Sequence, residues 1–125
     1  MSRIADIKRK KWNGAAFNLH QATERAYHTY LLTHTLYSPA THNIKYLRSR
    51  AEDMEPKLRP VWPRNDRQTR HRFELLKKAY IEARYSKHYK ITEEELAWLA
   101  GCVKELIGVV DEVCADGIDG GVTAA

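Results

Sequence analysis

The sequence lacks the features that mark membrane-spanning and secreted proteins. No apolar stretch approaches the roughly 18 to 20 residues that cross a bilayer. The basic start, Lys8 to Lys11, is followed by no apolar stretch of the kind that a secretory signal requires. The two cysteines, Cys102 and Cys114, lie twelve residues apart on one predicted helix, which separates them by about 18 Å. That separation is too large for a disulfide, so we expect reduced cysteines in a cytoplasmic protein.

Glycine-rich loops and metal-ligand spacings are also missing. Gly14 stands alone, and the glycines near the C-terminus follow no phosphate-binding pattern. Three histidines lack ligand spacing with carboxylates or thiols: His28, His34 and His42. No pattern of Ser, His and Asp residues indicates a catalytic triad. The sequence therefore predicts no metal site and no cofactor.

Charge is distributed unevenly over the 125 residues, which carry a net +5. Residues 1–11 carry +4 and residues 42–90 carry +8, whereas residues 91–125 carry −7. A basic middle with an acidic end suits either a site for a polyanion or electrostatic attraction between two copies of the chain. An ordinary solvated surface is the alternative interpretation.

The hydrophobic pattern predicts an all-α protein, an antiparallel up-and-down bundle of about four to five helices. Apolar residues recur at three- and four-residue steps over 13–36, 43–54, 67–87 and 93–115. Residues 55–64 hold three prolines and are predicted to be a loop from which Val61 and Trp62 return to the core. We expect residues 1–11 to form a basic N-terminal segment and residues 116–125 a flexible tail.

Helix starts have recognisable capping residues. Asn13, Asn43 and Asp66 are predicted N-caps. Thr92 and Glu95 have the spacing of a capping box, in which each side chain accepts the free N–H of the other residue.

Three motifs occur in a recognisable order. They are His20-Gln-Ala-x-Glu-Arg25, then Thr41-His-Asn43, then Ala79-Tyr-x-x-Ala-Arg-Tyr85. In this order they resemble the HEPN domain, a small helical module named for proposed nucleotide binding. The resemblance is to the type fused to, or encoded beside, a minimal nucleotidyltransferase, and it covers roughly residues 12–115. The resemblance implies an additional helix before the first motif, where this chain has only residues 1–11.

The resemblance assigns a candidate catalytic role to Arg84 and His88. Many HEPN proteins are ribonucleases in which an arginine holds the scissile phosphate and a histidine moves a proton. The spacer here is three residues, one fewer than in that pattern. On a continuous helix, residues four apart still share a face. The alternative is that both are surface cations near a helix end, where they complement the helix dipole.

A second group of residues is a candidate nucleotide site. The family resemblance places the His20–Glu24 face against the helix that carries Arg84 and Tyr85, where arginine would hold phosphate and tyrosine would stack on the base. The candidate nucleotide-binding residues are His20, Glu24, Lys78, Arg84, Tyr85 and Lys87. The alternative is a buried structural network in which Glu24 pairs with Arg84 or Lys78. His42 is interpreted as a neighbour of the Asn43 cap, and His71 as solvated.

The resemblance therefore favours a nucleotide- or RNA-binding helical module that works with a nucleotidyltransferase domain or partner, as a homodimer. Two alternatives stay open. One is a metal-independent ribonuclease toxin of a toxin–antitoxin pair, and the other is a purely structural dimerisation module.

Overall fold

The computed structural model describes residues 2–124, and it describes side chains from Ile7 to Ala115. Within these residues every regular element is helical, so the predicted all-α bundle is confirmed. The elements are α1 (Ser2–Thr35), α2 (Ile44–Met54), the 3-10 helix η1 (Pro56–Val61), α3 (Arg67–Lys78), α4 (Glu82–Tyr85) and α5 (Glu93–Ala124). No helix in the described part of the chain is both long and apolar enough to cross a bilayer.

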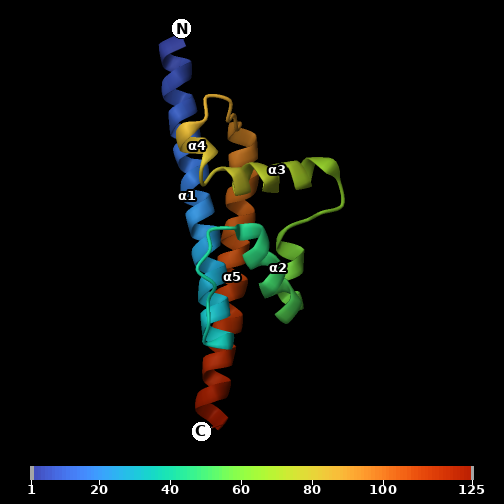
Figure 1. Cartoon of the computed structure of the whole chain (residues 1–125). Helices are drawn as coiled ribbons and strands as arrows, with labels where there is room; N and C mark the ends of the chain where they lie inside the picture. Colours follow the sequence, from blue (N-terminus) through green and yellow to red (C-terminus); the bar gives the residue numbers. More distant parts are fainter. Residues whose placement is uncertain (1, 125) are drawn as a thin grey trace.

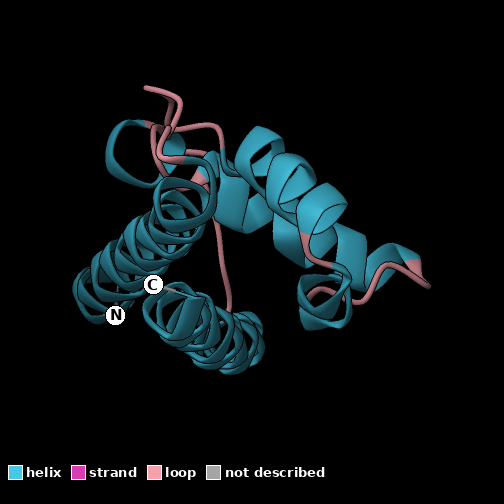
Figure 2. Ribbon diagram, turned by 90° about the horizontal axis from the view of Figure 1, so that it is seen from below, coloured by secondary structure: helices cyan, strands magenta, loops and turns pink. Residues whose placement is uncertain are grey.

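The two long helices, α1 and α5, lie side by side and run in the same direction (Figure 1). The shorter helices form a second group on one side of this pair (Figure 2). The segment from α2 to α4 returns the chain along the pair, so α5 starts beside the N-terminal half of α1 (Figure 1).

The core lies between the α1–α5 pair and the shorter helices. Tyr27 and Leu31 of α1 and Leu99 and Leu106 of α5 are almost fully buried. Val61 and Trp62 are 1% exposed, as the sequence predicts. The Trp62 indole N–H donates to the Tyr27 hydroxyl over 2.8 Å, which satisfies a polar pair inside the apolar core.

Both long helices extend beyond their predicted ends. α1 begins at Ser2, so Asn13 is not an N-cap but an 8% exposed residue inside the helix. Residues 2–12 contain no proline or glycine, and their Arg, Lys and Ala are good helix formers. α5 continues to Ala124 rather than ending near Ala115. The predicted flexible tail falls on residues 116–125, whose side chains lie outside the described residues.

The remaining caps form as predicted. The Asn43 side chain accepts the N–H groups of residues 45 and 46, and Asp66 accepts the Thr69 N–H over 2.8 Å. Thr92 and Glu95 form the reciprocal pair, with N···O distances of 2.9 and 3.1 Å.

The predicted single helix over 67–87 is wrong. α3 ends at Lys78 and α4 covers only Glu82–Tyr85, after which Ser86 is extended with φ −93° and ψ 130°. Tyr89, 4% exposed, is buried beyond the break, and its hydroxyl donates to the Leu75 carbonyl over 2.7 Å. Since this anchor turns the chain back under α3, a continuous helix cannot form. Residues 55–64, predicted as a loop, likewise contain the short η1.

Candidate functional site

A partly buried carboxylate, Glu24 of α1, is surrounded by three histidines. His42 Nδ1 lies 2.7 Å from Glu24 Oε1. His28 Nε2 lies 3.8 Å from Glu24 Oε1, and His20 Nδ1 lies 3.8 Å from Glu24 Oε2. The Glu24 side chain is 12% exposed and His20 only 1%. The predicted structural pairing of Glu24 with Arg84 or Lys78 is therefore wrong, because the cationic groups nearest its carboxylate are histidines.

The His20 imidazole is held away from water. Burial lowers its pKa from the usual value, and the nearby Glu24 carboxylate opposes this effect. His20 Nδ1 and Glu24 Oε2 have no hydrogen-bond partner among the described residues. A buried polar atom without a partner is costly, so this pair stabilises the fold less than a directly hydrogen-bonded pair would.

Tyr80, in the break between α3 and α4, covers the histidine cluster. Its ring centroid lies 4.5 Å from that of His42, with the rings 16° apart, and 5.2 Å from that of His20. Phe17 of α1 stacks beside it at 6.1 Å. The break that sequence periodicity did not predict is therefore what turns Tyr80 onto α1.

Arg84 of α4 lies over this aromatic surface. Its guanidinium carbon is 4.4 Å from the centroid of Phe17, 5.5 Å from that of Tyr80 and 5.1 Å from that of Tyr85. One Arg84 N–H group donates to the Tyr80 carbonyl over 3.1 Å. Aromatic faces attract a cation and restrict its orientation, so this exposed arginine is positioned with most of its donors free.

Arg84 also lines a cavity of about 390 Å³ between α1 and the segment around α4, which we call the basic cavity. Its lining is Arg9, Lys10, Asn13, Ala83, Arg84, Ser86 and Lys87. Four of these side chains are cations and none is acidic. Arg9 also donates to the carbonyls of Lys87 and Tyr89. α1 therefore holds the chain after α4 in place, and the cavity is preorganised for an anion.

Asn13 is the amide side chain in the lining of the basic cavity. It is 8% exposed, and its Oδ1 has no hydrogen-bond partner among the described residues. An unpaired buried carbonyl oxygen accepts from a hydroxyl or amine donor. The lining of the basic cavity thus combines four cations with one neutral amide side chain.

The structure distributes the predicted nucleotide-binding residues over three places. Arg84 and Lys87 line the basic cavity, and Tyr85, 74% exposed, contacts Arg84. Lys78 lines a neighbouring cavity of about 420 Å³, of which His42 and Tyr80 also form part. His20 and Glu24 lie beneath Tyr80 rather than in either cavity.

His88 lies apart from this group. α4 ends at Tyr85 and Ser86 is extended, so His88 does not follow Arg84 by one helical turn. The shared-face argument for an Arg84–His88 pair is therefore wrong. His88 is exposed and lines neither cavity.

Sequence reasoning missed several residues of the site. Arg9 and Lys10 were assigned to a separate segment, and Asn13 to a helix cap. Phe17 was not singled out, and His42 was interpreted as a cap neighbour. One signal was present in the sequence. Residues 8–11 are four consecutive cations, and they can belong to the same helix as the first motif.

A comparison with protein-family models identifies the domain. The HEPN domain matches residues 4–113, and the chain belongs to the HEPN domain family. The match includes residues N-terminal to Trp12, in keeping with the unbroken α1. A search of curated proteins gave no matching sequence.

Proposed function

We propose that this HEPN chain binds a nucleotide, free or at an RNA end, in the basic cavity, and works with a nucleotidyltransferase domain or partner protein. The observation that supports the binding most is Arg84, which an aromatic surface orients at the edge of a cavity with four cations. On this proposal the cations hold the phosphates. Tyr85, exposed beside Arg84, stacks on the base.

Binding is favoured over RNA cleavage by the placement of the two candidate catalytic residues. Arg84 is held in position, whereas His88 lies in the turn after α4. A general acid or base must reach the reacting oxygen together with the phosphate-binding group. The nucleotidyltransferase partnership and a homodimer rest on the family resemblance.

The decisive experiment is a calorimetric titration with ATP of the wild type, Arg84→Ala, Lys87→Ala and a matched control. The control is Lys104→Ala, an exposed cation on α5 that lines none of these cavities. We expect Arg84→Ala to weaken binding by at least about tenfold and the control to leave it unchanged. Thermal melts establish that each variant is folded.

Two outcomes would overturn the proposal. If the wild type binds neither ATP nor a short single-stranded RNA, the chain is a structural module. If it cleaves RNA without metal, and both Arg84→Ala and His88→Ala abolish cleavage, it is a ribonuclease.

A further inference from the structure

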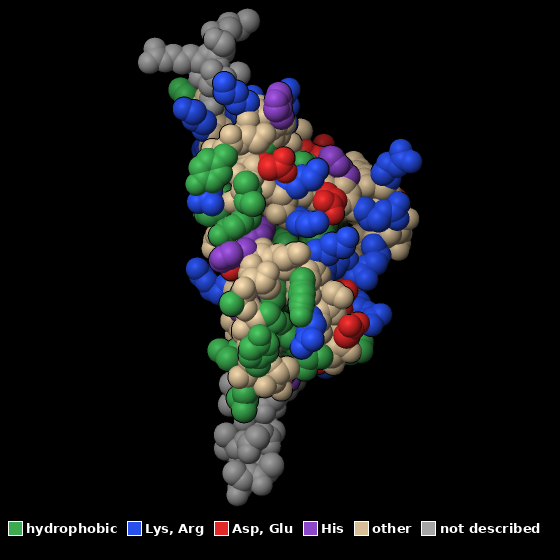
Figure 3. Space-filling model, in the orientation of Figure 1, with side chains coloured by type: hydrophobic (Ala, Val, Ile, Leu, Met, Phe, Trp, Pro, Cys, Tyr) green, Lys and Arg blue, Asp and Glu red, His purple; other side chains and the backbone are tan. Residues whose placement is uncertain are grey.

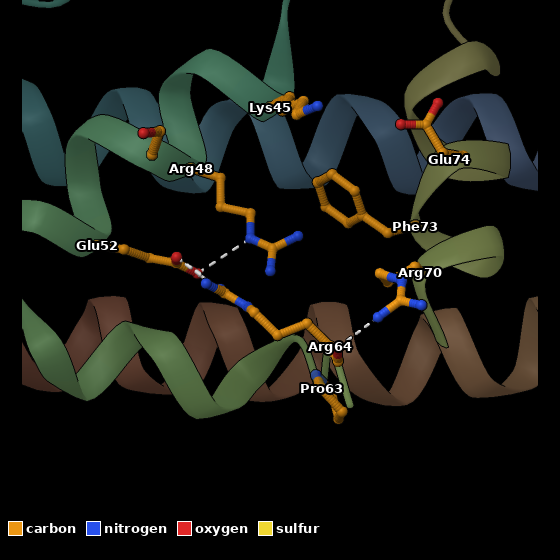
Figure 4. Close-up of a pocket in the computed structure, with 9 residues that line it drawn as sticks. Lys45, Arg48, Glu52, Pro63, Arg64, Arg70, Phe73 and Glu74 are labelled. Atoms are coloured by element: carbon orange, nitrogen blue, oxygen red, sulfur yellow. Dashed lines mark hydrogen bonds and ion pairs between the residues drawn. The ribbon is translucent and has the colours of Figure 1, made fainter. Parts of the chain in front are cut away.

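A further cavity, of about 500 Å³, lies between α2, α3 and the segment that joins η1 to α3. We call it the arch cavity. Its lining is Lys45, Arg48, Ser49, Glu52, Pro63, Arg64, Arg70, Phe73 and Glu74 (Figure 4). It shares no lining residue with the basic cavity, and none of the predicted site residues lies in it.

A buried carboxylate positions two arginines in the arch cavity. Glu52 of α2 is 5% exposed. It accepts from Arg48 Nε over 3.1 Å, and both its oxygens accept from Arg64 Nη2, over 2.6 and 2.8 Å. Figure 4 shows the two guanidinium groups converging on Glu52 from α2 and from the segment after η1. The negative charge of Glu52 is therefore fully compensated from within the protein.

Arg48 is fixed on its other sides as well. Its guanidinium carbon lies 4.4 Å from the centroid of the Phe73 ring, and Nη2 lies 3.5 Å from the Trp62 carbonyl oxygen. An arginine carries five N–H donors, and these contacts use only some of them. The wall of the cavity thus holds a planar cation whose position is set before any ligand arrives.

Two further cations line the cavity at exposed positions. Lys45 and Arg70 are both exposed, and Arg70 Nη1 donates to the Arg64 carbonyl over 3.1 Å. The lining has four cations against Glu52 and Glu74, a formal charge of +2. Lys and Arg side chains gather on this side of the molecule, over α3 and the segment before it (Figure 3).

We propose that the arch cavity binds a phosphate monoester, with the phosphate held jointly by the guanidinium groups that Glu52 positions and by the outer cations Lys45 and Arg70, and the organic part against Phe73 and Pro63. A phosphate dianion matches the formal charge of the lining, and planar guanidinium groups bind phosphate oxygens in pairs. The cavity has room for more than the phosphate. This site goes beyond the proposed function, because it is separate from the basic cavity.

The alternative is that the Arg48–Glu52–Arg64 network is only a clamp that fixes the proline-rich segment to α2. A clamp does not need the outer cations, Lys45 and Arg70. The test therefore changes these two residues and leaves the side chains of Arg48, Glu52 and Arg64 in place. The matched control is Lys104→Gln on α5.

The experiment is a titration followed by amide NMR, with ribose 5-phosphate as the probe and ribose and succinate as reference compounds. We expect saturable shifts of amides in residues 45–52 and 64–73 of the wild type with the phosphate alone. The double variant Lys45→Gln/Arg70→Gln should bind at least about tenfold more weakly, and the control should match the wild type. AMP and inorganic phosphate, titrated in parallel, establish whether the organic part contributes.

The proposal is overturned if ribose 5-phosphate gives no saturable shifts there, if succinate gives the same shifts, or if the double variant binds as the wild type does. The variant Arg84→Ala separates the two sites. It should weaken ATP binding in the basic cavity by at least about tenfold and preserve the response of the arch cavity. The proposal for either site can then be contradicted independently of the other.

Discussion

His42 Nδ1 lies 2.7 Å from Glu24 Oε1, a contact that joins the residue before the α2 cap to the middle of α1. The same imidazole stacks on Tyr80 at 4.5 Å. One exposed histidine thus connects three parts of the chain that are remote in sequence. His28 reinforces the connection, because its Nε2 lies 3.0 Å from the Thr41 carbonyl oxygen.

Replacing His42 should weaken the contacts that the segment before α2 makes with α1 and Tyr80. His42→Ala removes a stacked ring and a partner of Glu24, and His42 is more than half exposed. After allowance for solvent screening, we expect a loss of about 1 kcal/mol in the free energy of unfolding. Urea denaturation measures it. The comparison variant is His71→Ala, whose nearest carboxylate is 3.9 Å away, and it should change stability by less than about 0.5 kcal/mol. Equal effects of the two variants would contradict the stated role of His42.

His20 should make stability fall in mild acid. Its pKa in the folded protein lies below the usual 6.5, because burial penalises the imidazolium, and the Glu24 carboxylate opposes this effect only in part. The unfolded chain therefore takes up a proton more readily than the folded one, and stability is lost as pH falls below 6.5 toward the folded pKa. Each unit of pKa depression corresponds to about 1.4 kcal/mol.

The measurement is urea denaturation of the wild type and His20→Gln between about pH 7.5 and about pH 5. We expect the wild type to lose more stability over this range than the variant, which cannot titrate at this position. Parallel losses would show that groups other than His20 govern the acid response.

Replacing Glu52 should destabilise the protein more than replacing an exposed carboxylate does. Glu52→Gln leaves the Arg48 guanidinium, mostly buried against Phe73, without its carboxylate. Breaking a buried ion pair costs several kcal/mol, but Arg64 is half-exposed and water can solvate it after the change. We therefore expect the free energy of unfolding to fall by about 2 kcal/mol. Asp53→Asn is the control, since Asp53 is exposed and its nearest cation, Arg59, is 3.8 Å away. Chemical denaturation compares the two. A Glu52→Gln effect no larger than that of the control would mean that the network contributes nothing to stability.

Tyr27 and Trp62 provide a test of the core without a change of charge. Tyr27→Phe leaves the buried Trp62 indole N–H without its acceptor. The unmet donor should cost about 1 to 3 kcal/mol. Thermal or urea unfolding measures the loss, and an unchanged midpoint would mean that the indole finds another partner. Tyr37→Phe is a suitable control, because Tyr37 is 63% exposed.

Local signals in the sequence predicted those parts of the fold that local interactions determine. Each helix cap joins residues that are two or three apart, as the Asn43 cap, the Asp66 cap and the Thr92–Glu95 pair show. A short stretch of sequence is therefore enough to predict them. The burial of Trp62 follows from its size and apolar character. The helical class follows from apolar periodicity.

The rest depends on contacts between distant residues. Nothing near Ala79 is a proline or glycine, so the break between α3 and α4 has no local sign. It follows from the burial of Tyr89 under Leu75 and the stacking of Tyr80 on α1. The histidines around Glu24 and the cations of the basic cavity come together for the same reason. The parallel α1–α5 pair likewise reflects the path of the intervening segment rather than any property of either helix.

Arg9 should control the order of the segment after α4. Its guanidinium donates to the carbonyls of Lys87 and Tyr89, 78 and 80 residues away in sequence. Arg9→Ala removes these donors but not the Tyr89 anchor, so the helices should remain and the segment over 86–89 should open more often. Amide hydrogen exchange is the measurement, with faster exchange expected over 86–89 and no change in α2. Lys11→Ala, an exposed neighbour on α1, is the matched control. Unchanged exchange over 86–89 in Arg9→Ala would show that the Tyr89 anchor alone holds the segment, and the preorganisation of the basic cavity would then rest on Arg84.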